Sequence, residues 1–515
     1  MHGEEIGMCI DCELSPLSNK SSRFSCVAGK GGAQPSGLTR RTFAWGMGLG
    51  GTAALSAFFL PNALRAQTSR ITPDLARLQG GGRILIRGGV VISMDAKVGD
   101  FATADILIEG GRIREVRPDI HVDAANVAIV DAKDRIVIPG FIDTHHHFYQ
   151  GLLRNILPNG LLQPDYSRDI SDRLTAAYSA DDVYIGTLIS ALGMIDMGTT
   201  CAVDTSQVNH TPEHSHAGIK ALQDAGIRGV YAYSRGAGDR HQYPQDVSRL
   251  RKAYFSSSDQ LLSIALAGTL VQSQFEAARA ADVRFVSHGV NHRTEKALAD
   301  LARAKLLRPG DEYIHCTQLS PASWKIIKDT GGVVSLSPPI EMMMGHGMPG
   351  IQEALDNGIR PSLSSDVDVT FAQDPFTVMR STIALQRLLS LQRRQKDPGD
   401  QPKLLTVRDV LEFATIDGAN ALGLGSRTGS ITPGKEADIV ILDASRLNAW
   451  PLNNAVGSVV NLMNPMNVET VLIAGKVMKW RGALVGVDEQ KIKLLASAAR
   501  DGVVKRAGFR SSLLD

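Results

Sequence analysis

The feature that most constrains the fold is an alternation, between residues 141 and 366, of short apolar runs with longer helical stretches such as 179–198 and 294–307. Eight of the apolar runs are strand candidates: residues 141–147, 199–206, 228–234, 261–268, 284–290, 312–317, 332–338 and 360–366. Repeated β–α units with almost continuously apolar strands are typical of a parallel barrel whose strands are covered on both faces. The sequence therefore predicts an α/β fold, a (β/α)8 TIM barrel over residues 139–424.

The segments on either side of the predicted barrel have a different pattern. Residues 82–138 and 425–485 consist of short β-rich runs separated by turn-forming residues. We expect these two segments to combine into one small β-sandwich domain built from both ends of the chain. Residues 486–515 contain an amphipathic pattern that predicts a C-terminal helix.

Residues 1–66 are predicted to be a targeting extension. Arg40 and Arg41 precede an uncharged stretch, residues 43–60, and a small residue, Ala66, before a candidate cleavage point. The arginine pair resembles the bacterial twin-arginine export signal, so we expect a periplasmic or secreted protein carried by the twin-arginine export machinery. The alternative is a transmembrane helix, for which residues 43–60 are short and contain four glycines.

Composition narrows the classes of partner. The 515 residues include 55 Lys and Arg against 53 Asp and Glu, a formal net charge of +2. This balance lacks the basic excess of a nucleic-acid-binding protein, so we expect a small-molecule substrate and no nucleic acid. The five cysteines are too few for a disulfide scaffold. Assembly into an oligomer is compatible with this composition, and the oligomeric state stays open.

Histidines occupy the carboxyl end of the first predicted strand, which is where TIM-barrel enzymes place their active sites. This strand ends in three consecutive histidines. Because alternate strand residues face the same side, His145 and His147 point one way and His146 the other. Two imidazoles on one face form a bidentate clip for zinc or iron.

Three further side chains repeat this position at other strand ends. His288 lies near the end of the fifth predicted strand, His315 near the end of the sixth, and Asp366 ends the eighth. A carboxylate at the mouth of a barrel is costly unless it is paired or ligated. We therefore expect these side chains to share one site with the histidine clip, with Asp368 as the competing carboxylate two residues on.

These motifs together resemble the metal-dependent amidohydrolase superfamily, and most closely its cytosine deaminase and chlorohydrolase-like branch. The similarity extends over roughly residues 82–485. It rests on the segments VIPGFIDTHHH, GTTCAVD and TGSITPGKEADIVILD, and on the strand ends at His288, His315 and Asp366.

The resemblance implies one divalent metal ion, zinc first and iron second. The ligands that it implies are His145, His147, His288 and Asp366. It also implies that His315 contacts the substrate and the reactive water, with Asp366 acting as the base. Arg154 follows the HxH motif in a Leu-Leu-Arg stretch typical of this branch, and we expect it to bind substrate. Binuclear branches carry a carbamylated lysine on the fourth strand, and residues 261–268 contain no lysine.

The chain departs from this branch at one position. The aminohydrolases carry a proton-shuttling glutamate three residues after the strand-5 histidine, and Asn291 stands there in this sequence. An amide cannot exchange protons near neutral pH, so Asn291 is expected to position substrate. Glu341 and His346, in a loop after the seventh strand, are expected to contact substrate, and Glu341 is also a candidate replacement for the missing shuttle.

These observations predict a metal-dependent amidohydrolase. It would cleave a carbon–nitrogen bond of a small molecule by means of a metal-activated water. The missing glutamate favours an amide, a cyclic amide or a carbamate-like substrate. One alternative is an aminohydrolase that deaminates an amino-heterocycle with Glu341 as its proton shuttle. An alternative of another class is a noncatalytic metal-binding or ligand-binding protein on the same scaffold.

Overall fold

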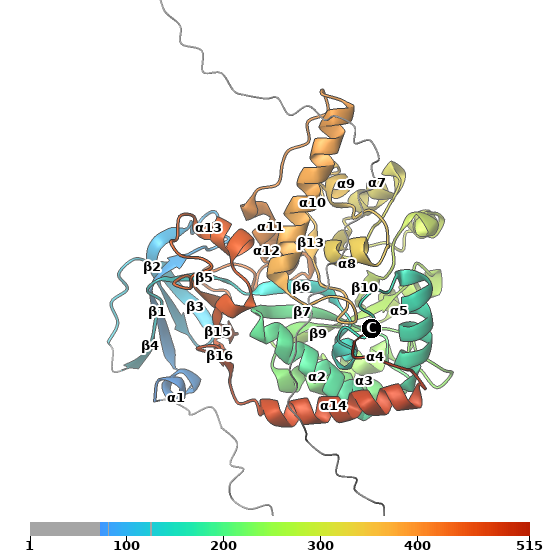
Figure 1. Ribbon diagram of the computed structural model, residues 1–515, viewed down its shortest axis with the longest axis horizontal. Coiled ribbons are helices and arrows are strands. Elements are labelled where there is room, and N and C mark those ends of the chain that lie inside the picture. The colour runs from blue at the N-terminus through green and yellow to red at the C-terminus, as the bar shows by residue number, and fades with distance from the viewer. Residues whose placement is uncertain (1–72, 81, 124–125, 515) are drawn as a thin grey trace, which may run out of the picture. The chain divides into compact units, whose positions relative to one another are not determined.

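A computed structural model describes residues 73–80, 82–123 and 126–514, and contains an eight-stranded parallel barrel (Figure 1). The strands follow one another around the barrel in chain order. They are β6 (Phe141–His146), β7 (Thr199–Ser206), β8 (Arg228–Tyr233), β9 (Leu262–Gly268), β10 (Arg284–Ser287), β11 (Glu312–Ile314), β12 (Val333–Leu336) and β13 (Ser362–Leu363). Each corresponds to one strand candidate, which confirms the predicted (β/α)8 fold, although β10 to β13 are shorter than expected.

The barrel closes where the chain after β13 meets β6. The backbone N–H of Asp366 donates to the carbonyl oxygen of His145 at 3.0 Å, and the N–H of His147 donates to the carbonyl oxygen of Asp366 at 2.9 Å. This seam brings the end of the last strand to the end of the first. It thereby places two of the predicted site segments side by side.

Helices follow the barrel strands, and most of them cover the outer surface of the barrel (Figure 1). They are α2 (Ala180–Asp196), α3 (Pro212–Ala225), α4 (Val247–Tyr254), α5 (Gln272–Ala280), α6 (Glu295–Arg303), α7 (Pro321–Asp329), α8 (Pro338–Met343), α9 (Ile351–Asp356), α10 (Pro375–Lys396), α11 (Val407–Phe413) and α12 (Ile416–Ala421). Helix α2 begins at a capping box: Ser179 accepts from the N–H of Asp182, whose carboxylate accepts from the N–H of Ser179.

Small and β-branched side chains fill the barrel interior. The buried cluster consists of Ile142, Cys201, Val203, Val230, Ala232, Ala265, Ala267, Val286, Ile314, Ala419 and Leu422. Two residues close the cluster from the end opposite the strand carboxyl ends. They are Ala419, on α12, and Leu422, which directly follows α12. The barrel is therefore a packed core and leaves the carboxyl ends of its strands for chemistry.

The two flanking segments combine in a second, nine-stranded sheet, with strands from both ends of the colour scale in Figure 1. β1 pairs antiparallel with β2, and parallel with both β4 and β5, so all nine strands belong to one branching sheet. β14 pairs antiparallel with β5 and joins the two halves. The strands are β1 (Arg83–Val91), β2 (Phe101–Glu109), β3 (Arg112–Arg117), β4 (Val127–Asp131), β5 (Arg135–Pro139), β14 (Ile439–Asp443), β15 (Val468–Ile473), β16 (Lys476–Trp480) and β17 (Ala483–Leu484).

A buried ion-pair network links the barrel to this second sheet. The fully buried guanidinium of Arg228, at the start of β8, donates to Asp438 at 2.6 Å and to Glu436 at 2.5 Å. Thr428 also donates to Asp438, at 2.8 Å. Removing one member of such a network leaves an uncompensated buried charge, so these residues fix how the sheet segment meets the barrel.

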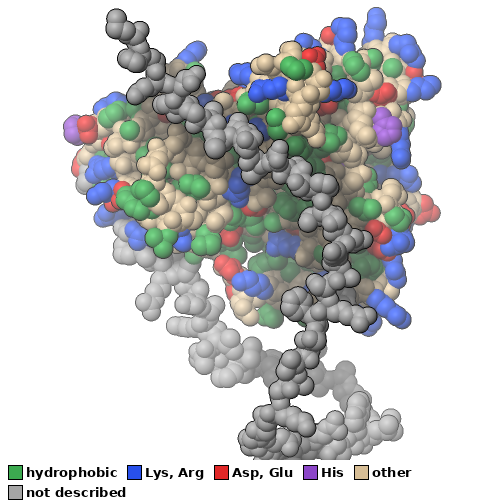
Figure 2. Space-filling model, turned by 45° about the horizontal axis from the view of Figure 1, so that its top comes forward, with side chains coloured by type: hydrophobic (Ala, Val, Ile, Leu, Met, Phe, Trp, Pro, Cys, Tyr) green, Lys and Arg blue, Asp and Glu red, His purple; other side chains and the backbone are tan. Residues whose placement is uncertain are grey.

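Outside the barrel and the sheet lie α1 (Pro73–Gln79), α13 (Ala455–Gly457) and α14 (Glu489–Arg506). α14 packs on α2, with Ala496 and Val503 buried. Within the described residues, no helix has both the length and the apolar character needed to cross a bilayer. The proposed export signal, and its alternative as a membrane span, lie outside the described residues. On the face drawn in Figure 2, basic and acidic side chains are interspersed.

Candidate active site

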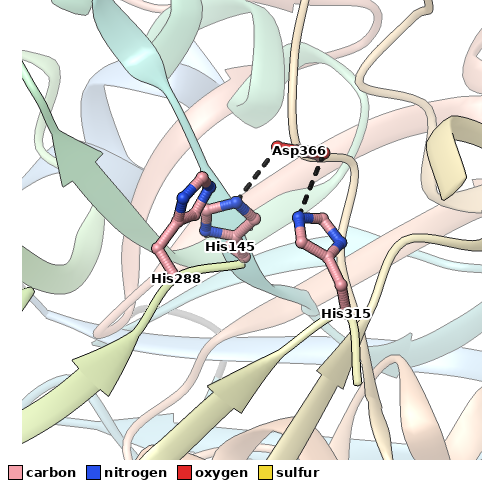
Figure 3. Close-up of side chains that lie close together, drawn as sticks. All are labelled: His145, His288, His315 and Asp366. Carbon is pink, nitrogen blue, oxygen red and sulfur yellow. Dashed lines mark hydrogen bonds and ion pairs between the residues drawn. The ribbon is translucent and has the colours of Figure 1, made fainter. Parts of the chain in front are cut away.

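Four side chains converge at the carboxyl ends of the barrel strands (Figure 3). One potential ligand atom from each of His145, His288, His315 and Asp366 lies within 4.8 Å of the others. The Nε2 atom of His145 is 3.0 Å from Oδ1 of Asp366, and Nε2 of His315 is 3.6 Å from Oδ2 of the same carboxylate. Asp366 therefore lies within reach of both His145 and His315.

His147 lies against the same cluster from the end of β6. Its Nε2 atom is 3.3 Å from Nε2 of His288 and 3.5 Å from Oδ1 of Asp366. His145, His146 and His147 are all buried. The structure thus brings together all five side chains that the strand-end pattern singled out.

The electrostatics of the cluster suit a bound cation. Burial lowers the pKa of His147 to about 3, with His145 adding to the effect, and burial also holds the pKa of His288 well below its usual value. Two neutral imidazoles therefore present ring nitrogens to each other. Burial acts to raise the pKa of Asp366, but His315 and His145 hold it well below the ordinary range, so the carboxylate is ionised.

The donor set fits one divalent metal ion. Imidazole nitrogens with one carboxylate are ligands that zinc and iron both accept. The Nε2 atom of His315 is buried and has no hydrogen-bond partner among the described residues, as expected for an atom that faces a ligand. In the described part of the chain, this is the one group of histidine, cysteine or acidic side chains with metal-binding geometry.

Two of these residues hold an unusual backbone conformation. His315 has φ of 73° and Asp366 has φ of 62°, both in the left-handed region that residues other than glycine seldom adopt. Such conformations cost on the order of 1–3 kcal/mol and persist where the surroundings fix them, often at active sites. The strain therefore coincides with two residues of the cluster, Asp366 and His315.

A family comparison agrees with this geometry. Residues 136–478 match the model of the Amidohydrolase family. The chain belongs to the amidohydrolase family. It is accordingly a hydrolase that acts on carbon–nitrogen bonds, as predicted from the strand-end residues.

Curated relatives match this amidohydrolase over most of their length. A 5'-deoxyadenosine deaminase of Methanobrevibacter smithii is 27% identical over 439 residues, which cover 79% of this chain and 95% of the relative. A 5-methylthioadenosine/S-adenosylhomocysteine deaminase of Acetivibrio thermocellus is 26% identical over 438 residues, covering 80% of this chain and 97% of the relative.

Solved structures support the same fold. An adenosine deaminase of Xanthomonas campestris with bound zinc superposes with a TM-score of 0.72 at 22% identity, covering 82% of this chain and 98% of that one. A zinc complex of atrazine chlorohydrolase from Arthrobacter aurescens gives a TM-score of 0.70 at 22% identity, covering 81% and 100%. At this identity the likeness concerns the fold.

In this amidohydrolase, Glu341 stands behind His315. Oε1 of the buried Glu341, on α8, lies 3.1 Å from Nδ1 of His315 and accepts from the N–H of Ser337 at 2.8 Å. Burial raises the pKa of Glu341, while His315 counteracts the rise. Burial acts to lower the pKa of His315, but Asp366 and Glu341 raise it above its usual value. The imidazole is therefore held between two carboxylates and favours its protonated form.

His346 lies next to this pair. Its ring centroid is 4.7 Å from that of His315, and its Nε2 atom is buried without a hydrogen-bond partner among the described residues. Burial lowers the pKa of His346 to about 4, so the ring is neutral. This position leaves a polar atom available to a substrate, in keeping with the predicted role.

Asn291 is engaged elsewhere. It is the N-cap of a 3-10 turn, His292–Thr294: its side-chain oxygen accepts from the N–H of Arg293 at 2.9 Å, and its amide group donates to the carbonyl of Gly289 at 3.0 Å. A side chain with both polar ends occupied in a cap has no free group for proton transfer. The expectation that Asn291 positions substrate receives no support from these contacts.

Arg154 also lies apart from the metal cluster. Its Nε atom is 3.3 Å from Asp368, and it donates to the carbonyl of Ile189 at 3.2 Å. It borders a cavity of about 410 Å³ together with Asp368 and Gln373. The structure shows an ion pair for Arg154 and leaves its predicted substrate contact without support.

Sequence reasoning missed the partners of His146. This residue turns away from the cluster, as the strand alternation predicted, and its Nε2 atom lies 3.7 Å from Asp368. Its Nδ1 atom lies 3.0 Å from the hydroxyl of Ser365, which also donates to Asp143 at 2.5 Å. Asp368 is thus a partner of His146 rather than a metal ligand. Asp143, close to the histidine run in sequence, was the available signal.

Proposed function

We propose that this amidohydrolase uses one divalent ion, with zinc favoured over iron, to hydrolyse an amide, a cyclic amide or a carbamate-like bond of a small molecule. The observation that carries the proposal is the loss of the strand-5 carboxylate. Asn291 occupies its position and serves as a helix cap. Protonation of an amino-heterocycle needs a proton donor beside the ring, whereas in amide hydrolysis the base that deprotonates the attacking water can return that proton to the leaving nitrogen.

The ligands of the ion would be His145, His147, His288 and Asp366. When bound, a divalent ion lowers the pKa of a coordinated water toward about 7 and polarises the target carbon. The zinc-bound adenosine deaminase and atrazine chlorohydrolase that share the fold support zinc as the first choice.

The remaining steps belong to side chains of this chain. The ionised Asp366 takes the proton of the attacking water and delivers it to the leaving nitrogen, which departs as an amine. His315 donates a hydrogen bond from Nε2 to the oxygen that gains negative charge. Glu341 accepts from Nδ1 of His315, 3.1 Å away, and so holds the imidazole in the orientation and protonation state that this donation requires.

Deamination of an amino-heterocycle is the second candidate. It is favoured by the names of the curated relatives, which are deaminases of 5'-deoxyadenosine or of 5-methylthioadenosine and S-adenosylhomocysteine. In that reaction the pair of His315 and Glu341 would supply the proton to the heterocycle. The substrate distinguishes the two candidates, because only the deaminase releases ammonia from an amino-heterocycle.

A product screen tests the proposal. The metal-loaded protein would be incubated with amides, cyclic amides and carbamates, and separately with purine nucleosides, cytosine and pterins, while released amine and ammonia are measured. Asp366→Asn is the inactive control. Hydrolysis confined to the first group supports the proposal, and ammonia release from the second group alone replaces it with the deaminase.

We also propose that the protein is exported through the twin-arginine machinery to the periplasm or beyond. The support is the Arg40-Arg41 pair, the uncharged residues 43–60 and the small residue Ala66. A protein that folds around a metal ion before export is compatible with a route that carries folded proteins.

A further inference from the structure

Thr205, the penultimate residue of β7, contacts both histidines of the metal clip. Its hydroxyl oxygen lies 2.9 Å from Nδ1 of His145, and its backbone carbonyl oxygen lies 3.0 Å from Nδ1 of His147. Thr205 is fully buried. One residue therefore contacts the outer nitrogen of two imidazoles through two different groups.

Strand pairing explains how one residue reaches both rings. β6 and β7 are parallel neighbours, and His146 pairs with Asp204. The register shifts by one residue between Asp143 and His146. Thr205 follows Asp204, so its side chain faces the same side of the sheet as His145 and His147.

These contacts decide which ring nitrogen faces the cluster. A carbonyl oxygen only accepts, so Nδ1 of His147 carries the proton and Nε2 presents its lone pair. For His145, binding of a cation through Nε2 likewise requires a proton on Nδ1, and the hydroxyl of Thr205 is the acceptor at hydrogen-bond distance. Partners of this kind fix the tautomer and ring orientation of metal-binding histidines.

We infer that Thr205 is a positioning residue for the metal centre: its hydroxyl orients His145 and its carbonyl orients His147. The inference rests on the proposed metal-dependent function and goes further by assigning metal affinity to a residue outside the ligand set. Glu341 contacts Nδ1 of His315 in the same way. The rings of His145, His147 and His315 are therefore each held through Nδ1.

Substitutions on β7 separate the contribution of the Thr205 hydroxyl from that of the rest of the residue. Thr205→Val removes the hydroxyl and keeps the shape and the carbonyl, whereas Thr205→Ser keeps both polar groups. Thr200→Val is the matched control, because Thr200 is also buried on β7 and its hydroxyl has no hydrogen-bond partner among the described residues. The full chain would be titrated with zinc against a chromophoric chelator, and with cobalt(II) to follow the visible spectrum of the site.

We expect Thr205→Val to weaken zinc binding about 10- to 100-fold and to alter the cobalt spectrum. Thr205→Ser and Thr200→Val should bind zinc within about 3-fold of the wild type, a margin well inside that range. Equal zinc affinity in Thr205→Val and wild type would overturn the inference and leave the proposed function intact. A Thr205→Ser protein as weak as Thr205→Val would show that retaining the hydroxyl does not preserve the metal site, and would also overturn the inference. A wild-type chain that binds no zinc would remove both proposals.

Discussion

The Nδ1 atom of His315 lies 3.1 Å from Oε1 of Glu341, which places the carboxylate behind the imidazole, on the side away from Asp366. This arrangement gives the buried carboxylate a route to the reacting atoms through His315. A carboxylate that orients and charges an imidazole is a familiar way to make a histidine a better proton donor. The missing strand-5 carboxylate makes this pair the central feature of the mechanism.

The first prediction concerns this pair. Glu341→Gln preserves shape and removes the negative charge that holds His315, so turnover should fall about 10²-fold at unchanged metal content. Steady-state kinetics on the best substrate of the screen, with elemental analysis, would measure it. Glu353→Gln, an exposed position on α9, is the matched control. A change confined to KM would instead make Glu341 a substrate-binding residue.

The second prediction concerns Asn291. Because its side chain caps a turn, Asn291→Ala should lower the free energy of unfolding by about 1 kcal/mol and leave kcat within a few-fold of the wild type. Asp366→Asn in parallel should cost about 10²–10⁴-fold in kcat. Denaturant unfolding would measure the stability of both variants, and steady-state kinetics would measure their kcat. A fall in kcat of Asn291→Ala comparable to that of Asp366→Asn would contradict a role confined to capping.

The third prediction concerns the histidine run. His145→Ala and His147→Ala should lose bound metal and activity together, whereas His146→Ala should keep the metal. His146→Ala should instead lower stability by about 1–3 kcal/mol, because it removes a buried partner of Asp368 and Ser365. Elemental analysis and thermal unfolding separate the two outcomes. A metal-free His146→Ala protein and a loaded His145→Ala protein would reverse the strand assignment.

The fourth prediction concerns pH and stability. Glu312 is buried in the barrel, both of its carboxyl oxygens lack hydrogen-bond partners among the described residues, and burial raises its pKa to about 7 against a usual 4.5. Between these values the unfolded chain loses the proton while the folded protein keeps it. Rising pH therefore destabilises the fold from about 4.5 to about 7, by about 3 kcal/mol in total.

Glu312→Gln stays uncharged at every pH, so it should be more stable than the wild type at pH 8 and equal to it at pH 4. Chemical unfolding at both pH values, with the exposed Glu276→Gln as a control for the loss of one charge, would measure this difference. An equal gain at both pH values would assign the effect to packing rather than to ionisation.

The fifth prediction concerns export. Replacing Arg40 and Arg41 by lysine retains the charge and should leave the precursor in the cytoplasm, because the arginine pair is read by a receptor. Fractionation and immunoblotting would detect the unprocessed chain. Normal processing of the double-lysine variant would indicate an ordinary secretion signal or a membrane anchor.

Local pattern was enough to predict much of this protein. The eight barrel strands follow from apolar runs alternating with helical stretches, and residues of both flanking segments form a second sheet. The sequence also predicted that five side chains meet at one site, because parallel strands in a barrel end on the same face. They are His145, His147, His288, His315 and Asp366. Periodicity and strand direction are properties that a sequence carries locally.

Tertiary structure decided what each polar side chain contacts. Three outcomes depend on where separate loops meet. Asn291 caps a turn and Arg154 pairs with Asp368, where the sequence suggested contacts with substrate for both. Glu341 supports His315. The contacts of Thr205 with His145 and His147 join residues about 60 positions apart and depend on a one-residue register shift between two strands. Hydrogen bonds select partners by distances of a few tenths of an ångström, and only the packed chain sets those distances.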